Sequence, residues 1–179
     1  MKRFPGSFLT ITLLLFVATT SVSQFDPPAE AAEIEWLSWS EAIEKMKDEP
    51  RKILVDVYTE WCGYCKQMDR NVFPDAIVSA YIRDHFYAVK LDAEAQEPLV
   101  YDNHTFRWLK DQGRNGVHEL AFALLDGSLR YPSMVYMDET QKRISISPGF
   151  KNPQNLMNEL KFINENHYKQ MSWEEYKNR

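Results

Sequence analysis

Two stretches of this chain are almost continuously apolar, Ile53–Thr59 and Phe86–Leu91. Apolar runs of this length are typical of strands that are buried on both faces, as in a parallel sheet. Two helices are expected between these strands, over Cys62–Val72 and Ala76–His85. Asp75 stands where it can cap the second helix. The pattern therefore predicts a strand, two helices and a second strand, in that order.

Further elements flank this unit. The capping box Ser38-x-x-Glu41 predicts a helix over Trp39–Lys47. Towards the other end of the chain, two strands are expected at Ser133–Met137 and Arg143–Ser147. The link between these strands is too short for a crossover, so they are expected to pair antiparallel.

The C-terminal region has the pattern of an amphipathic helix that begins at Asn152-Pro153. The apolar face of this helix is expected to hold residues at helical spacing: Leu156, Leu160 and Ile163. The tail that follows, Ser172–Arg179, contains two aromatic residues, Trp173 and Tyr176, which are candidates for docking on the domain.

A long polar and aromatic stretch, Asp92–Arg130, separates the two halves of the pattern. A small hairpin is expected within it at Tyr101–Phe106. A helix is expected over Val117–Leu125, with Gly127 as its C-terminal cap. Strands that alternate with helices, followed by a hairpin and a helix, predict a three-layer α/β sandwich with a mixed central sheet flanked by helices.

The first 23 residues have the pattern of a secretory signal peptide. Lys2 and Arg3 precede an apolar run over Phe8–Ala18, and Ser21-Val22-Ser23 provides the small residues of a cleavage site. The apolar run is short for a membrane span, and an uncleaved N-terminal anchor is the alternative. Residues 24–33 are expected to form a linker.

The composition suits an exported domain. A hydrophobic content of 44% is enough for a normal core. The 21 Lys and Arg against 26 Asp and Glu give a formal net charge of −5, and cleavage after Ser23 would make it −7. Without a basic patch, nucleic acid and anionic membranes are poor partners. The signal-peptide pattern predicts a periplasmic or secreted protein with no stable membrane insertion after cleavage.

The only two cysteines of the chain, Cys62 and Cys65, form a C-x-x-C motif at the expected start of a helix. Unpaired backbone N–H groups and the helix dipole favour the thiolate there, and the thiolate is the nucleophile. The second thiol lies one helical turn further on, so it can attack a mixed disulfide formed on the first. The motif predicts a redox-active dithiol.

A metal site and a purely structural disulfide are the alternative uses of these cysteines. A structural zinc site needs four ligands, and no two of the four histidines have the H-x3–5-H spacing. Short C-x-x-C rings are strained, and strained, exposed bridges tend to be labile. We therefore expect neither a metal nor an organic cofactor.

The residues around the motif resemble the thioredoxin superfamily one by one. Asp56 lies six positions before Cys62, as the buried aspartate of thioredoxin's central strand does. Lys90, in the next expected strand, resembles the lysine that pairs with that aspartate. Pro132 resembles the cis-proline beside the dithiol, and Gly149 resembles the family's late glycine.

Within the superfamily, the motif region is most similar to the C-terminal domain of the DsbD-type interchange proteins. The matching run is Lys52-x-x-x-Asp56-x-Tyr58-x-x-Trp61-Cys62-x-x-Cys65-Lys66 with Phe73-x-Asp75. The resemblance covers Ile34–Asn166 and implies a thioredoxin-like domain over 34–168, followed by a tail over 169–179. The chain departs from the family between Lys90 and Pro132, which are 42 residues apart, so Asp92–Arg130 is expected to be an insertion before the cis-proline strand or an enlarged helix region. Nothing resembles the dimerisation domain of DsbC-type isomerases, and we expect a monomer.

The chemistry assigns catalytic roles to four residues. Cys62 attacks a substrate disulfide from an exposed position at the helix start, and the more buried Cys65 resolves the mixed disulfide. Asp56 lies in an apolar strand, where desolvation would raise its pKa and suit it to accept the proton of Cys65. Alternatively, Asp56 is a core carboxylate satisfied by Lys90. Lys90 itself either pairs with Asp56 or points to solvent.

Four further residues are candidates for contact with the substrate. Trp61 would shield one side of Cys62, although plain core packing is the alternative for this side chain. Tyr64 would face outward between the thiols. A cis bond before Pro132 would turn the backbone of Tyr131 toward the dithiol, where it could pair with an extended substrate segment. An ordinary proline at the entry to a strand is the alternative.

These observations favour an exported thiol–disulfide oxidoreductase that reduces or isomerises protein disulfides. Its partners would be proteins with disulfides, and a membrane thiol reductant is a candidate electron donor. Two alternatives stay open: a dithiol oxidase that introduces disulfides, and a thioredoxin-fold binding or assembly module with little turnover.

Overall fold

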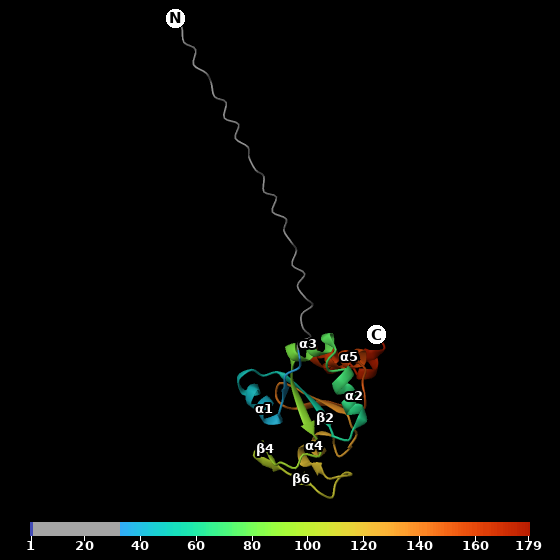
Figure 1. Cartoon of the computed structure of the whole chain (residues 1–179). Coiled ribbons are helices and arrows are strands. Elements are labelled where there is room, and N and C mark those ends of the chain that lie inside the picture. The colour runs from blue at the N-terminus through green and yellow to red at the C-terminus, as the bar shows by residue number, and fades with distance from the viewer. Residues whose placement is uncertain (2–32) are drawn as a thin grey trace.

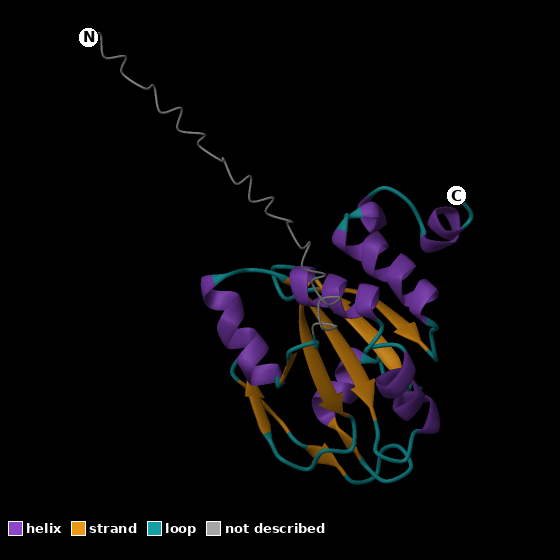
Figure 2. Cartoon of the chain, turned by 45° about the horizontal axis from the view of Figure 1, so that its top comes forward, coloured by secondary structure: helices purple, strands orange, loops and turns teal. Residues whose placement is uncertain are grey.

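A five-stranded mixed sheet lies between two layers of helices in the computed structural model of this chain, which describes Met1 and residues 33–179 (Figures 1 and 2). The elements in chain order are β1 (Trp36–Leu37), α1 (Trp39–Asp48), β2 (Lys52–Tyr58), α2 (Gly63–Asn71), α3 (Ala76–His85), β3 (Phe86–Asp92), β4 (Leu99–Tyr101), β5 (His104–Phe106), β6 (Trp108–Leu109), β7 (Val117–His118), α4 (Glu119–Leu124), β8 (Ser133–Met137), β9 (Arg143–Pro148), α5 (Pro153–Asn164), a 3-10 turn (His167–Lys169) and α6 (Trp173–Lys177). The expected signal peptide and linker fall outside the described residues, apart from Met1 and Glu33.

The strand order in the sheet is β1-β3-β2-β8-β9. β2 pairs parallel with β3, and β8 pairs antiparallel with both β2 and β9. The predicted mixed sheet is therefore confirmed. The register of the parallel pair places Asp56 of β2 beside Lys90 of β3.

The sequence signals for helix ends act as expected. The Ser38 hydroxyl accepts a hydrogen bond from the Glu41 N–H, and the Glu41 carboxylate accepts one from the Ser38 N–H. Asp75 caps α3 through one carboxylate oxygen. Asn152 caps α5, whose first residue is proline.

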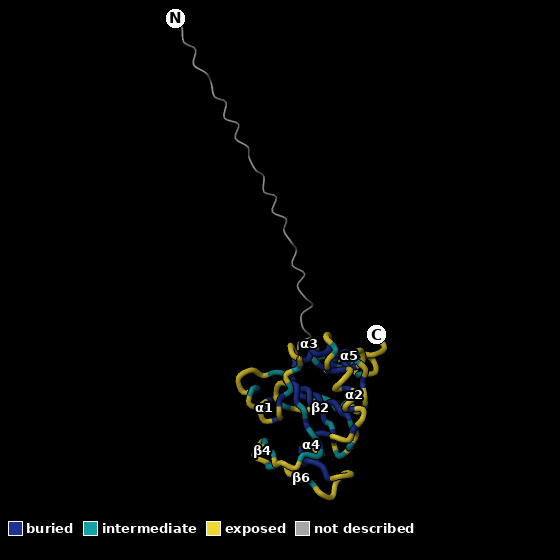
Figure 3. Tube along the Cα trace, viewed as in Figure 1, coloured by how far each residue is buried: buried dark blue, intermediate teal, exposed yellow. Residues whose placement is uncertain are grey.

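The core has two halves, one on each face of the sheet. Side chains of β2 and β3 point alternately to the two faces of the sheet. Those on one face pack against α1 and α4, and those on the other face pack against α2, α3 and α5. Every residue of β2 except Tyr58 is buried, as the dark centre of Figure 3 shows. This double coverage explains the continuous apolar run in the sequence.

The stretch 92–130 lies largely at one end of the sheet, where β4, β6 and α4 gather (Figure 1). The predicted hairpin is confirmed as β4 and β5, and both turn residues, Asp102 and Asn103, have positive φ. Gly127 follows α4 with a φ of +71°, and its N–H bonds the Phe122 carbonyl. Buried residues of α4 belong to the core, so this stretch is integrated into the domain.

The helix predicted over Val117–Leu125 begins two residues too early. Val117 and His118 form β7, which pairs with β6, and α4 starts at Glu119. The side chain of His118 causes the change because its Nδ1 accepts the Leu120 N–H and caps the helix. The two-residue strands β1, β6 and β7 are too short to show a period in the sequence.

The docking expected for the C-terminal tail is present. Trp173 and Tyr176 of α6 pack on Phe162 of α5, with ring centroids 5.3 and 5.1 Å away. Among the described residues, no helix combines the length and the apolar character needed to cross a membrane.

Candidate active site

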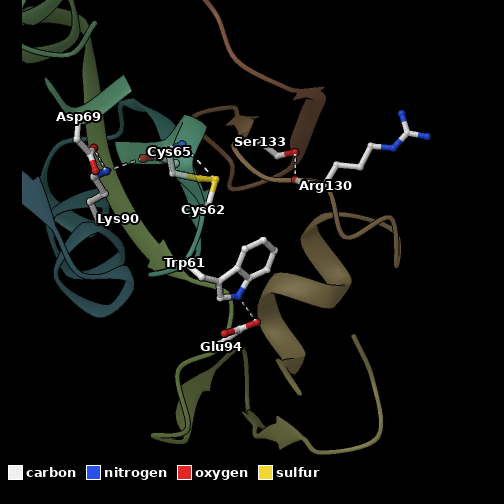
Figure 4. The surroundings of a disulfide bond; sticks show 9 residues. Trp61, Cys62, Cys65, Asp69, Lys90, Glu94, Arg130 and Ser133 are labelled. Carbon is white, nitrogen blue, oxygen red and sulfur yellow. Dashed lines mark hydrogen bonds and ion pairs between the residues drawn. A yellow bond between two sulfur atoms is a disulfide. The ribbon is translucent and has the colours of Figure 1, made fainter. Parts of the chain in front are cut away.

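The two cysteines form a disulfide where β2 passes into α2 (Figure 4). Cys62 is the N-cap of α2, and its Sγ accepts a hydrogen bond from the Cys65 N–H at 3.1 Å. The sulfur of Cys62 therefore occupies the position where an N-cap side chain satisfies an otherwise unpaired helix N–H. The same position stabilises negative charge on Cys62 once the disulfide is reduced.

The expectation that Cys62 is exposed is wrong for this disulfide form. Cys62 is 5% exposed and Cys65 is 2% exposed. The side chain of Trp61, the residue before Cys62, extends from the motif towards Glu94 (Figure 4). The order of exposure of the two cysteines is as expected.

Behind the disulfide, the buried Asp56 forms an ion pair with the partly buried Lys90. The Lys90 Nζ donates to Asp56 Oδ2 at 2.7 Å, and the Asp56 side chain is 1% exposed. Oδ1 of Asp56 accepts no hydrogen bond from the described residues. The alternative that Lys90 points to solvent is excluded, because its ammonium also faces the rings of Trp36, Tyr58 and Phe73 at 4.8–5.1 Å.

Burial controls the protonation of this pair. Desolvation raises the pKa of Asp56 from its ordinary value of 3.8 to about 6, although Lys90 opposes the rise. Burial also disfavours the charge on Lys90, but the carboxylates of Asp56 and Asp69 outweigh it and raise the Lys90 pKa. Lys90 thus stays charged at neutral pH, whereas Asp56 takes up a proton at a pH slightly below neutral.

Asp69 is a site residue that the sequence reasoning missed. Its carboxylate forms a second ion pair with Lys90. A cleft of about 230 Å³ beside the disulfide is lined by Cys65, Asp69 and Lys90 among its residues. Asp69 lies four residues after Cys65 on α2, and helical spacing alone would have placed it on the same face.

Trp61 is tied to the stretch 92–130. Its Nε1 donates to Glu94 Oε1 at 2.9 Å, as Figure 4 shows. Asn115 donates to both oxygens of Glu94, and the Arg114 guanidinium lies 5.5 Å from the Trp61 ring. Trp61 is 48% exposed, which excludes plain core packing. The stretch therefore supplies part of the surface next to Cys62, which the sequence did not reveal.

Gly116 explains why the loop that carries Arg114 and Asn115 lies where it does. It has a φ of +85°, and a Cβ at this position would lie 2.3 Å from the ring of Trp108. Only glycine avoids this collision, so the backbone passes directly against the indole.

The loop before β8 approaches the dithiol from the other side. The Tyr131–Pro132 peptide bond is cis, as the resemblance implied. The ring of Tyr131 packs edge-on against Trp61 with centroids 6.1 Å apart. Burial, reinforced by Glu94 and Asp92, raises the pKa of Tyr131 to about 12, so its hydroxyl keeps its proton.

A second aromatic contact completes the surface. Tyr64, between the two cysteines, is 63% exposed and therefore faces outward as predicted. Its ring lies 6.0 Å from that of Phe150, which is 39% exposed. Trp61, Tyr64 and Phe150 thus expose apolar surface around the disulfide, as interaction sites commonly do.

The histidine of the insertion that is most buried has a structural role. His118 caps α4 and bonds the Glu97 carbonyl through Nε2. Burial lowers the pKa of His118. Within the part of the chain that the structure describes, no group of three or more His, Cys, Asp or Glu residues is arranged to hold a metal ion.

Comparison with known proteins identifies the domain. The model of the family described as Thioredoxin-like matches residues 35–138, which is more than half of the chain. An uncharacterized protein of Caenorhabditis elegans is 32% identical over 62 residues, which cover 34% of this chain and 8% of that protein. The chain therefore spans only a small part of that relative's length.

Solved structures share the fold. DsbH oxidoreductase superposes with a TM-score of 0.56 at 16% identity, covering 83% of this chain and 96% of the other. A thioredoxin-fold protein from Helicobacter pylori gives 0.53 at 18% identity, covering 70% and 76%. A disulphide-isomerase candidate from Bacteroides thetaiotaomicron gives 0.51 at 24% identity, covering 75% and 95%.

Proposed function

This chain belongs to the thioredoxin-like family, and on that premise we propose that it is an exported thiol–disulfide oxidoreductase that reduces or isomerises protein disulfides. One observation carries the proposal. The disulfide of Cys62 and Cys65 stands at the start of α2, in front of the Asp56–Lys90 pair and within an exposed aromatic surface. A structural bridge would need neither of these surroundings.

The reaction begins with the reduced protein. The Cys62 thiolate attacks one sulfur of a substrate disulfide, and the other substrate sulfur leaves as a thiolate that takes up a proton. Cys65 then loses its proton and attacks the Cys62 sulfur, which releases the second substrate thiol. Two electrons pass to the substrate, and the protein ends in the disulfide form. In isomerisation, a thiol of the substrate itself attacks the mixed disulfide and regenerates reduced Cys62.

Asp56 is the proposed acceptor of the Cys65 proton. Its pKa of about 6 keeps it ionised at neutral pH yet basic enough to take a proton. The cleft lined by Cys65, Asp69 and Lys90 is large enough to hold a water beside Cys65. Lys90 and Asp69 are then positioning residues that set the charge around Asp56.

Trp61, Tyr64, Tyr131 and Pro132 are proposed to hold the substrate. Tyr131 lies in the loop two residues before β8, where an extended substrate segment could pair with its backbone. The exposed rings of Trp61 and Tyr64 would cover the apolar part of such a segment.

The proposed setting is an oxidising compartment outside the cytoplasm. The N-terminal sequence has the signal-peptide pattern, and both cysteines of the chain lie in one motif. A reductase in such a compartment needs an electron supply. The similarity to the DsbD-type motif favours a membrane thiol reductant as the donor to the disulfide of Cys62 and Cys65.

Insulin reduction tests the proposed activity. With dithiothreitol as electron source, the protein is expected to accelerate the precipitation of the insulin B chain in proportion to its concentration. A binding module with little turnover would leave the rate at that of dithiothreitol alone. The matched control is protein whose reduced thiols have been alkylated, which keeps the fold and removes the chemistry.

The reduction potential tests the direction of the reaction. A strongly oxidising couple needs a cation beside the first cysteine as well as the helix start. Here the Lys90 ammonium is paired with Asp56 and Asp69, and Lys66 is exposed on α2. We expect a potential of about −200 to −270 mV, measured against glutathione or dithiothreitol buffers. A value above about −150 mV would establish the oxidase alternative instead.

A further inference from the structure

A buried lysine, Lys151, lies behind the aromatic surface, outside the Asp56–Lys90 pair. Lys151, in the turn between β9 and α5, is only 5% exposed. Burying an ammonium group is costly unless each of its N–H donors is satisfied. The surroundings of Lys151 meet this condition, and they fix one particular turn of the backbone.

The three donors of the Lys151 ammonium bond three consecutive carbonyls. Nζ lies 2.9 Å from the Ser147 oxygen, 3.3 Å from that of Pro148 and 2.8 Å from that of Gly149. Gly149 has a φ of +90°, a backbone conformation that glycine adopts without strain. The ammonium therefore closes the end of β9 into a turn that an apolar side chain could not hold.

Glu159 of α5 supplies the opposite charge. Its carboxylate lies 4.0 Å from Lys151 Nζ and accepts hydrogen bonds from the Ser147 hydroxyl at 2.8 Å and the Tyr136 hydroxyl at 3.1 Å. Tyr136 belongs to the central part of the sheet and is 1% exposed. The turn is thus anchored to β8, β9 and α5 at once.

The anchored turn reaches the dithiol surface at two points. The Gly149 N–H donates to the Pro132 carbonyl at 2.7 Å, which ties the turn to the cis-proline loop. The next residue, Phe150, extends its ring to that of Tyr64 between the two cysteines. We name this pair of rings, Tyr64 and Phe150, the aromatic pad.

We propose that Lys151, paired with Glu159, is a positioning residue that holds Phe150 in the aromatic pad, and that the pad receives a large apolar side chain next to the substrate cysteine. This inference rests on the proposed function and adds the kind of segment that the site prefers. The pad is exposed and apolar, whereas its anchor is buried and charged. Contact with an apolar side chain removes ring surface from water, which stabilises the complex.

Two synthetic peptide disulfides test the inference. They differ only beside the cysteine, where one has leucine and the other serine, and a fluorophore and a quencher report cleavage. We expect the wild-type protein to show a KM for the leucine peptide roughly fivefold lower than for the serine peptide, with similar kcat. Phe150→Ala should remove this preference by raising the KM of the leucine peptide alone. Ile77→Ala, at an exposed apolar residue of α3, is the matched control and should retain the preference.

The positioning role is tested by Lys151→Met combined with Glu159→Gln, which removes both buried charges together and so leaves neither unpaired. We expect the same loss of preference as in Phe150→Ala, and no further loss when Phe150→Ala is added. A merely structural role would instead lower stability or change both peptides equally. Should the double variant not fold, Glu159→Gln alone removes the counter-charge, and a KM increase confined to the leucine peptide is again expected.

The outcomes separate the inference from the proposed function. Cleavage of both peptides by the wild type without a preference overturns the inference and leaves the oxidoreductase intact. A preference that survives in Phe150→Ala also overturns it, as does an unchanged KM in the Lys151 and Glu159 variants. Absence of any cleavage by the reduced wild-type protein overturns the proposed function, and the inference with it.

Discussion

The Cys62→Ser variant is expected to lose insulin reductase activity by at least about 100-fold, because a serine hydroxyl is not ionised at neutral pH and cannot replace the thiolate. The Cys65→Ser variant is expected to behave differently. Its Cys62 still attacks the substrate, but nothing resolves the product, so a mixed disulfide should accumulate. Mass spectrometry of the variant after incubation with an oxidised substrate measures this adduct.

The geometry supports this division of labour. The Cys62 sulfur is the N-cap of α2 and receives the Cys65 N–H, so a negative charge on it is stabilised. Cys65 lies one turn into the helix and is the less exposed of the two. Both variants lack the disulfide, and their thermal unfolding should therefore be compared with that of reduced wild-type protein. Full turnover by Cys62→Ser, or an adduct on Cys62→Ser but not on Cys65→Ser, would reverse the assignment of the nucleophile.

The sequence predicted the framework of the fold because its signals were local and strong. Each of three signals predicted one feature. The apolar runs predicted the buried strands β2 and β3, and the capping box at Ser38 predicted the start of α1. The short link between β8 and β9 predicted their antiparallel pairing. The start of α4 was placed wrongly because β6 and β7 have two residues each, too few for periodicity to show. Tertiary pairing, not local propensity, decides such short segments.

Only those residues of the candidate site that belong to a recognisable motif could be predicted from the sequence. Cys62, Cys65, Asp56, Lys90 and Pro132 lie at family spacings, and their neighbourhood followed from these spacings. Glu94 and Arg114 reach Trp61 from a stretch with no motif, and Lys151 is buried although the sequence around it is polar. Contacts of this kind depend on how loops pack in the folded protein. Loop packing leaves no periodic pattern of apolar residues that could be recognised in a single sequence.

The charge on Asp56 makes the folded protein less stable at neutral pH, and its removal should show this. The Asp56 pKa of about 6 lies above its ordinary value of 3.8, so the folded state binds a proton more tightly than the unfolded chain does. Stability from this group is therefore fully present below about pH 4 and is lost as the pH rises to about 6. A shift of this size corresponds to roughly 3 kcal/mol.

Asp56→Asn is thus expected to leave stability nearly unchanged at pH 3.5 and to raise it increasingly through pH 4–6, with a plateau above. The remaining Lys90 charge is not left alone, because Lys90 still pairs with Asp69 and is 22% exposed. Urea unfolding of the oxidised protein at several pH values measures the difference from wild type. Asp111→Asn, in an exposed loop, is the matched control. A loss of stability at pH 7 would mean that the Asp56–Lys90 pair holds the fold together.

Asp56→Asn is expected to stabilise the fold but to slow the step in which Cys65 releases the substrate. Without the carboxylate, Cys65 loses its nearest proposed proton acceptor, and release of substrate from the mixed disulfide should slow roughly 10- to 100-fold at pH 7. The first attack by Cys62 should change far less, so single-turnover kinetics separate the two steps. The deficit should shrink as the pH rises, because hydroxide then removes the Cys65 proton directly. Equal release rates for both proteins across pH 6–9 would remove Asp56 from the mechanism and leave it a buried structural partner of Lys90.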